Sequence, residues 1–131
     1  MMRLSHGDFA FDLEDEWWKA AGMEHWKPAG QSYPPDVADV LLVRIADIAP
    51  VRRNLRHGVF NNDAETGLSA RDRAISILTG FRRQLALPPV EVQKAADGEM
   101  YPYRLTHGAH RFYLSIAAGF THIPAVIARE W

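Results

Sequence analysis

The chain has 131 residues, of which 47 % are hydrophobic, and its 15 basic residues against 16 acidic ones leave a net charge of −1. These totals predict one domain of ordinary size with a real core, and they exclude extensive disorder and a strongly basic nucleic-acid-binding protein. The chain contains no cysteine, which excludes disulfides, thiolate metal ligands and cysteine nucleophiles.

The location of the protein is predicted from what the N-terminus does not contain. Acidic residues interrupt the first 16 positions, so the basic-then-apolar pattern of a signal peptide is not present. No apolar run approaches the roughly 20 residues that span a membrane. We therefore expect a soluble cytoplasmic protein that does not bind membranes.

Charge is distributed unevenly along the chain. Residues 1–39 hold eight acidic residues against three basic ones, whereas residues 40–83 hold eight arginines against four acidic residues. The acidic head and the basic middle are either solvated surfaces or surfaces that attract each other, within one molecule or between two.

The first 37 residues predict an acidic cap on the remainder of the chain, which forms the main domain over 38–131. Residues 9–11 indicate a short strand. Residues 13–21 then indicate a helix with Asp12 as its N-cap and Gly22 as its stop. The expected cap is therefore mainly helical.

Three tryptophans lie in this cap. Trp17 and Trp18 are adjacent, so on a helix they point about 100° apart and cannot share one narrow stripe. We expect both, together with Trp26, to pack the cap on the domain. The alternatives are a platform on which bases stack and an acidic, aromatic surface that binds a protein partner.

The middle of the chain predicts a strand, a long loop and a helix. Residues 40–45 are apolar and β-branched, which is typical of a strand, and residues 45–50 form a turn that leaves it. Residues 51–67 form a basic loop. Residues 69–85 form the clearest helix, with a capping-box-like pair at Ser69 and Asp72. Its apolar face consists of Ala74, Ile77, Leu78, Phe81 and Leu85.

The C-terminal third predicts a hairpin, a helix and a last strand. Residues 90–94 and 101–105 are strands separated by the turn at Asp97-Gly98. Residues 109–118 form a helix whose buried side is made by Phe112, Tyr113, Ile116 and Ala117, and residues 123–128 form the last strand.

The junction between the second hairpin strand and this helix predicts an anion-binding site. Gly108 separates the strand from the helix, and His110 and Arg111 lie in the first helical turn. The first amides of a helix lack internal partners, and the helix dipole adds positive charge there. A glycine lets an anion approach the backbone, while a guanidinium and an imidazole close around it.

The ordered C-terminal motifs resemble the ParB/sulfiredoxin superfamily. They are Leu87-Pro-Pro-Val-Glu-Val92, Asp97-Gly98, Tyr103-Arg-Leu-Thr-His-Gly-Ala-His-Arg111, Ala117-Ala-Gly119 and Ile123-Pro-Ala-Val126, and the resemblance covers roughly residues 38–129. It implies a small α/β (α+β) domain with a mixed sheet of about four to five strands and helices, here with the N-terminal helical cap added.

The resemblance also implies a nucleotide site. Family members hold the phosphates of a triphosphate, here ATP or CTP with Mg²⁺, on a Gly-x-His-Arg loop. Carried over to this chain, the site is Gly108, Ala109, His110 and Arg111, with His107 one residue before the loop. Basic residues after the opening strand join the site in relatives, and Arg52 and Arg53 are the nearest candidates, with Arg56 beside them.

Two departures from the family limit the reaction. Sulfiredoxins have cysteine at the x of Gly-x-His-Arg, where this chain has Ala109, so sulfinic-acid reduction through a thiol is excluded. Partition proteins continue into a helix-turn-helix domain, whereas this sequence ends at Trp131, so we do not expect sequence-specific DNA partitioning by this chain alone.

The remaining candidate residues have simpler interpretations. Among the acidic residues Asp47, Asp63 and Glu65, Asp47 is the weak favourite for a general base or Mg²⁺ ligand, because it follows the opening strand. His122 is expected to be structural, and no metal site is assigned to the three C-terminal histidines. A solvated helix face is the simplest interpretation of Arg71, Arg82 and Arg83.

Three functions remain open. The first is nucleotide binding, with the nucleotide as a switch or as the phosphoryl donor of a phosphotransferase or NTPase, in which His110 acts at the phosphates. The second is a ParB-like nuclease that cleaves phosphodiesters, for which the basic stretch from Arg44 to Arg83 is mild support. The third is a non-catalytic module that binds a protein through the acidic, tryptophan-rich N-terminus.

Overall fold

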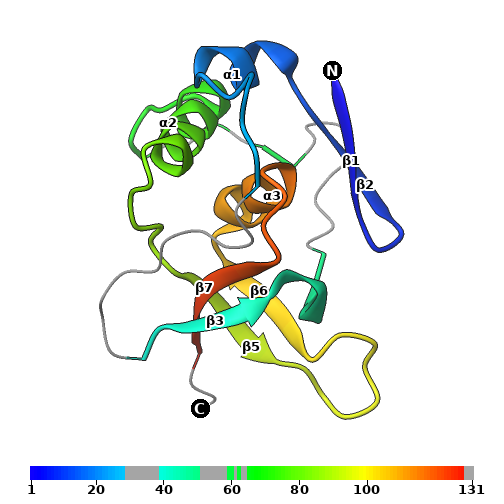
Figure 1. The fold of residues 1–131 in the computed structure, drawn as a ribbon. Coiled ribbons are helices and arrows are strands. Elements are labelled where there is room, and N and C mark those ends of the chain that lie inside the picture. Colours follow the sequence, from blue (N-terminus) through cyan, green and yellow to red (C-terminus); the bar gives the residue numbers. More distant parts are fainter. Residues whose placement is uncertain (29–38, 51–58, 61, 63–64, 129–131) are drawn as a thin grey trace.

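The computed structural model describes residues 1–28, 39–50, 59–60, 62 and 65–128, and Figure 1 shows a mixed sheet with helices stacked on one of its faces. The predicted α+β class is confirmed. In chain order the elements are β1 (Met2–His6), β2 (Phe9–Leu13), α1 (Asp15–Ala20), β3 (Leu41–Arg44), the 3₁₀ turn η1 (Ile45–Asp47), β4 (Ile48–Ala49), α2 (Ala70–Arg82), β5 (Val90–Lys94), β6 (Tyr103–His107), α3 (Ala109–Ala117) and β7 (His122–Ile127).

The main sheet has five strands in the order β3-β7-β5-β6-β4, as the sequence predicts in number and in mixed character. The expected hairpin is confirmed, because β5 pairs antiparallel with β6. β5 also pairs parallel with β7, and β4 pairs parallel with β6. Parallel neighbours need long crossovers, and here α2 and α3 lie in the crossovers and cover the sheet.

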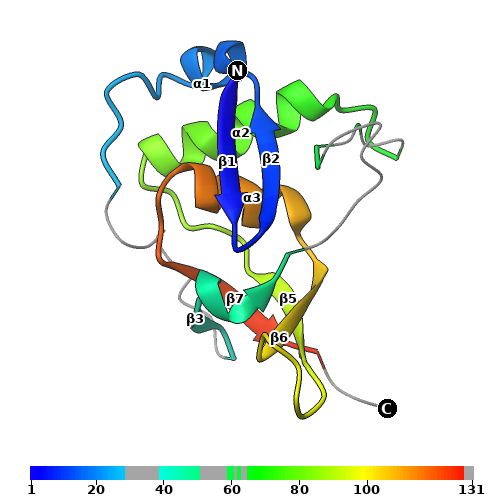
Figure 2. The ribbon, with the colours of Figure 1, turned by 90° about the vertical axis from the view of Figure 1, so that its right-hand side faces the viewer.

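Helix α3 occupies the centre of the molecule, between the sheet and α2, with α1 beyond α2 (Figures 1 and 2). Phe112 and Tyr113 are fully buried, as expected. Leu114 and Ser115 are buried as well, whereas the predicted face members Ile116 and Ala117 keep partial exposure. A helix covered from several sides buries more than one stripe, so the expected single apolar face was too narrow.

The apolar face of α2 is confirmed at its centre and wrong at its end. Ala74, Leu78 and Phe81 are buried, and Ile77 is half-buried. The helix ends at Arg82, so Leu85 lies beyond it and is 51 % exposed. This exposed leucine lines a cleft that shares Ile77 and Arg111 with the cavity described below.

The N-terminal segment differs from the predicted helical cap. It begins with a hairpin, β1–β2, of which the sequence predicted only a fragment, and its helix α1 is six residues long. Asp12 does not cap that helix, because it lies in β2 and its carboxylate binds Arg3. Residues 9–13 alternate between buried and exposed, and this period of two extends the chain through the predicted cap position.

The N-terminal segment nevertheless packs on the main domain. The buried His6 donates from Nε2 to the Ile48 carbonyl, with 2.6 Å between N and O. The Trp26 indole donates to the Ala118 carbonyl over 2.8 Å. The expected packing role of this tryptophan is thereby confirmed. The predicted division at residue 37/38 lies outside the described residues and stays a prediction.

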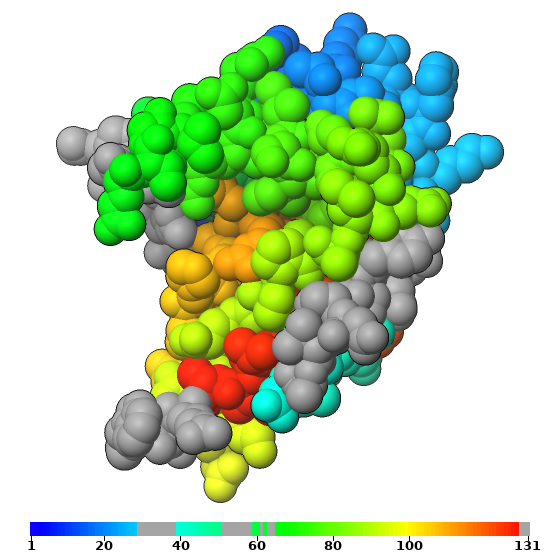
Figure 3. Space-filling view, turned by 90° about the vertical axis from the view of Figure 1, so that its left-hand side faces the viewer, coloured from blue at the N-terminus to red at the C-terminus, as the bar shows by residue number. Residues whose placement is uncertain are grey.

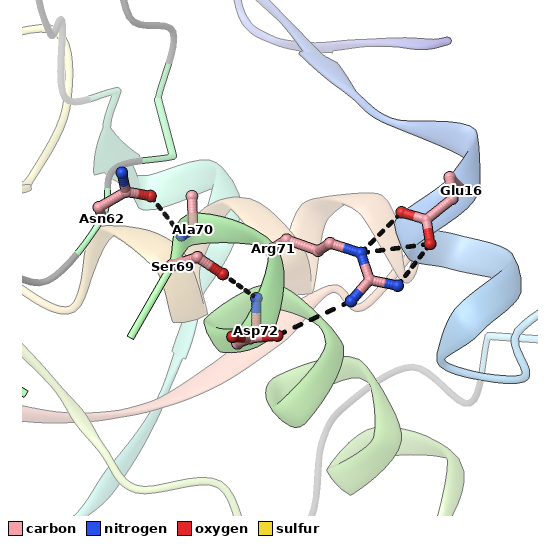
Figure 4. A network of polar contacts seen from close by, with 6 residues as sticks. All are labelled: Glu16, Asn62, Ser69, Ala70, Arg71 and Asp72. Atoms are coloured by element: carbon pink, nitrogen blue, oxygen red, sulfur yellow. Dashed lines mark hydrogen bonds and ion pairs between the residues drawn. The ribbon is translucent and has the colours of Figure 1, made fainter. Parts of the chain in front are cut away.

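The acidic head and the basic middle meet within one molecule. Arg71 of α2 binds Glu16 of α1 with two guanidinium nitrogens, and the Nε–Oε2 distance is 2.9 Å (Figure 4). The hydrogen bond from Arg71 lowers the pKa of the Glu16 carboxyl. Arg82 of the same helix donates to the Ala21 carbonyl. Two of the three arginines expected on a solvated helix face therefore fasten the N-terminal segment.

Ser69 caps α2 as predicted, and its removal gives the first testable expectation. Its Oγ accepts from the Asp72 amide over 3.0 Å (Figure 4). We expect Ser69→Ala to lower the free energy of unfolding by about 1 kcal/mol, because an amide of the first turn loses its acceptor. Urea denaturation measures this loss. Ser76→Ala, in the exposed middle of the same helix, is the control and should not destabilise; equal effects of the two changes would contradict a capping role.

Candidate functional site

The predicted strand–glycine–helix junction is confirmed between β6 and α3. Gly108 has φ 103 and ψ 33, in the left-handed region, and acts as the N-cap of α3. The first intrahelical hydrogen bond runs from the Phe112 amide to the Gly108 carbonyl over 2.9 Å. The amides of residues 109–111 precede that bond, so they lie at the end of the helix where partial positive charge collects.

A β-bulge places His107 at this junction. Glu91 faces His107 and Val92 faces Leu105, so Thr106 is an extra residue in β6. The Thr106 hydroxyl donates to Glu91, at 2.9 Å from the carboxylate Oε1 and 3.2 Å from the carbonyl oxygen. Bulges re-aim side chains and often lie next to functional sites. This bulge directly precedes Gly108, and the side chain of His107 next to it is exposed.

Gly108 is required by packing as well as by backbone geometry. A Cβ at this position would lie 2.7 Å from Cγ1 of the buried Val90 and 3.1 Å from Nη2 of Arg111. From the sequence alone, the reason for a glycine here is that it lets an anion approach the backbone closely. The structure adds a second reason, because the backbone of the junction is pressed against β5.

The junction forms one wall of a cavity of about 240 Å³, hereafter the phosphate cavity. Its lining residues are Arg73, Ile77, Leu105, Thr106, His107, Gly108, Ala109, His110 and Arg111. Four consecutive predicted site residues, 108–111, and His107 therefore line one cavity. Figure 3 shows the start of α3, in orange, reaching the surface between α2 in green and the segment that leads into β5.

Arg111 is held in a fixed position in the wall of this cavity. Its Nη1 donates to the Pro88 and Pro89 carbonyls over 3.0 and 2.7 Å. Burial lowers the pKa of the Arg111 guanidinium, and the positive charge of Arg73 lowers it further. Among the residues that the structure describes, no carboxylate forms an ion pair with Arg111.

Arg73 is the cavity residue that sequence reasoning missed. It lies on α2, four residues before Ile77, and so at the margin of the apolar face. The other arginines of this helix have different positions, since Arg71 and Arg82 bind the N-terminal segment. The sequence offers no local signal that separates Arg73 from Arg71, because Ile75 lies one helical turn after Arg71 and is half-buried as well.

His110 lines the cavity but is buried, whereas phosphate ligands at a surface are usually exposed. It is only 4 % exposed and stacks on Phe60, with ring centroids 5.5 Å apart and an interplanar angle of 10°. Phe60 in turn contacts the rings of Phe11 and Trp17. An aromatic cluster built partly from the N-terminal segment therefore holds the imidazole, which lines the phosphate cavity.

The structure separates Asp47 from this site. Asp47 precedes β4, which runs parallel to β6 with Ile48 opposite Tyr103. Gly108 follows the far end of β6, about five residues or roughly 16 Å along the strand. Asp47 does not line the phosphate cavity, and this distance argues against its predicted role as a general base there.

Several other predicted residues fall elsewhere. Arg52, Arg53, Arg56 and Asp63 lie outside the described residues, so their predicted roles stay predictions. His122 begins β7, and its Nδ1 lies 2.9 Å from the Thr121 hydroxyl. No group of three or more histidine, aspartate or glutamate side chains in the described part of the chain is placed to hold a metal ion.

No protein-family model and no curated protein matches the chain. Among solved structures, the chain is similar to sulfiredoxin from Arabidopsis thaliana, with 19 % identity and a TM-score of 0.46 over 70 % of this chain and 85 % of that one. Within the described ranges, no helix is long and apolar enough to cross a membrane.

Proposed function

We propose that this chain binds a nucleoside triphosphate and grips its phosphates in the phosphate cavity. The observation that carries the proposal is the convergence of two guanidinium groups, Arg73 from α2 and Arg111 from α3, on one cavity at the N-terminus of a buried helix. Three sources of positive potential thus meet in one place: two arginines and the amides of residues 109–111.

Electrostatics favour an anion in this cavity. The charge of Arg73 opposes the charge of Arg111 and adds to burial, which is the larger cause, in lowering the pKa of Arg111. A phosphate between them replaces this repulsion with two attractions, and planar guanidinium groups match phosphate oxygens in pairs. Because Arg111 is already fixed by two backbone carbonyls, little side-chain freedom is lost when it binds.

The choice of a triphosphate, ATP or CTP, follows from the resemblance of the Gly108–Arg111 loop to nucleotide-binding relatives. Mg²⁺ would accompany it. Among the described residues that line the cavity there is no carboxylate, so phosphate oxygens and water, rather than these residues, would hold the ion. The cytoplasm, where we expect the chain to act, supplies such nucleotides with Mg²⁺.

The arrangement supports binding more directly than phosphoryl transfer. The side chains that line the cavity include hydrogen-bond donors. The buried His110, which is one of the lining residues, stacks on Phe60. A transfer reaction would also need a group that accepts the proton of the attacking hydroxyl. We therefore propose binding, with the nucleotide as a switch, as the function that these residues support best.

Calorimetric titration tests this proposal directly. We expect ATP, CTP or GTP with Mg²⁺ to bind the full chain, and adenosine without phosphates to bind far more weakly, because the phosphates supply the charge interaction. Raising the salt concentration should lower the affinity for the triphosphate, because salt screens the charge interaction. No heat of binding for any of the three triphosphates at millimolar concentration would sink the proposal.

A further inference from the structure

Arg111 also lines a second cleft, next to the phosphate cavity. Its volume is also about 240 Å³, and its lining residues are Ser76, Ile77, Gly80, Phe81, Leu85, Ala86, Leu87, Pro88 and Arg111. Apart from Arg111 and the Ser76 hydroxyl, its side chains are apolar. We call it the Gly80 cleft. It shares Arg111 and Ile77 with the phosphate cavity, so the two hollows are neighbours.

Gly80 lies within α2 without a structural reason for being glycine. Its φ is not in the left-handed region, and a Cβ built on it would meet no atom within 4 Å. Glycine inside a helix is less favourable than alanine by roughly 0.5–1 kcal/mol. The helix thus carries an unfavourable residue at the point where its surface forms the wall of a cleft, and the effect of that residue is to keep the cleft open.

Arg111 connects the two hollows chemically. The Pro88 and Pro89 carbonyls hold its Nη1, so the guanidinium is fixed at a position where Arg111 lines both the phosphate cavity and the Gly80 cleft. A fixed guanidinium can bind phosphate through its edge and stack an aromatic ring on its face. Each hollow alone is smaller than the roughly 300–1,000 Å³ typical of small-molecule sites, whereas the two together fall within that range.

We propose that the Gly80 cleft holds the base of the nucleotide whose phosphates occupy the phosphate cavity. The base lies in the opening that Gly80 leaves, between the apolar side chains of Ile77 and Leu85, with the guanidinium of Arg111 between base and phosphates. This inference rests on the proposed function. It explains the exposed Leu85 as the rim of a ligand site and Gly80 as the residue that makes room.

The test compares ATP with inorganic tripolyphosphate, which has the charge and lacks the base. Both are titrated calorimetrically, with Mg²⁺, into the wild-type chain and into Gly80→Leu, whose side chain fills the cleft. We expect ATP to bind the variant about tenfold or more weakly, as loss of base stacking implies, and tripolyphosphate to bind both proteins within about twofold. The thermal midpoint of the variant should not fall, because leucine favours a helix interior more than the glycine that it replaces.

Thr79→Leu is the matched control, since the neighbouring residue lines neither hollow, and it should leave both ligands unaffected. If neither ATP nor tripolyphosphate binds the wild type, the proposed function fails, and this inference fails with it. If both bind and Gly80→Leu changes neither, or weakens both equally, the phosphate site stands and the placement of the base is overturned. Loss of ATP affinity alone supports the inference.

Discussion

Arg73→Gln is expected to weaken triphosphate binding about 10- to 100-fold, the largest loss of affinity that we anticipate for a single change that keeps the fold. Hydrogen bonds to charged groups contribute about 1.5–3 kcal/mol each, and this change removes one charged partner of the phosphates. It also removes the smaller of the two causes that lower the pKa of Arg111, while burial, the larger cause, remains. Calorimetry gives the affinity, and thermal melting confirms that the fold persists.

Arg83→Gln is the control for this change. It removes the same charge from the same region of the chain, at the C-cap of α2, and Arg83 does not line the phosphate cavity. A specific contact predicts a large loss for Arg73→Gln and little change for Arg83→Gln. Equal losses for the two variants would mean that only net charge matters, and that Arg73 makes no contact with the phosphates.

Arg111 is less suited to this test, although its role follows more directly from the sequence. Its Nη1 holds the Pro88 and Pro89 carbonyls, so Arg111→Ala would leave these carbonyls without the donor and disturb the segment that leads into β5. A loss of binding in that variant would have two causes. In Arg73→Gln, thermal melting separates a lost phosphate contact from a loss of stability, while Arg71 and Arg82 still join α2 to the N-terminal segment.

The junction at Gly108 was predictable because its signals are local. A strand pattern, a glycine and a helix pattern follow one another directly, and the structure contains them in that order. Helix α2 was predictable for the same reason, with its cap at Ser69 and three apolar residues at helical spacing. Local patterns of this kind are set by backbone hydrogen bonding and by burial of one face.

The remainder of the site depends on packing between segments distant in sequence. Arg73 is 38 residues from Arg111, and nothing local to either residue indicates that they share a cavity. The ring of Phe60 against His110 and the N-terminal hairpin against α3 are similar cases. Asp47 is a further case, because the sequence places it only after the opening strand. The parallel pairing of β4 with β6 puts it near the start of β6, whereas Gly108 follows the end of β6.

Gly108→Ala is expected to destabilise the chain by about 2–5 kcal/mol, the largest loss of stability among these predictions. An alanine in the left-handed region costs roughly 1–2 kcal/mol, and φ at this residue is 103. Its Cβ would also lie 2.7 Å from Val90 Cγ1, and overpacking of this kind costs about 1–3 kcal/mol. Since domains are stable by only about 5–15 kcal/mol, we expect the thermal midpoint to fall by roughly 10 °C or more.

Gly67→Ala separates the two causes. Gly67 also has a positive φ, of 74, and no atom lies within 4 Å of the Cβ that alanine would add, so only the backbone term of about 1–2 kcal/mol should appear. A double-mutant cycle completes the test, because Val90→Ala removes the atom that the new Cβ would meet. In that background Gly108→Ala should cost less, by about 1–2 kcal/mol. If Gly108→Ala abolishes triphosphate binding and leaves stability unchanged, then the glycine serves only the approach of the anion, as the sequence alone suggests, and the packing against Val90 is not what requires it.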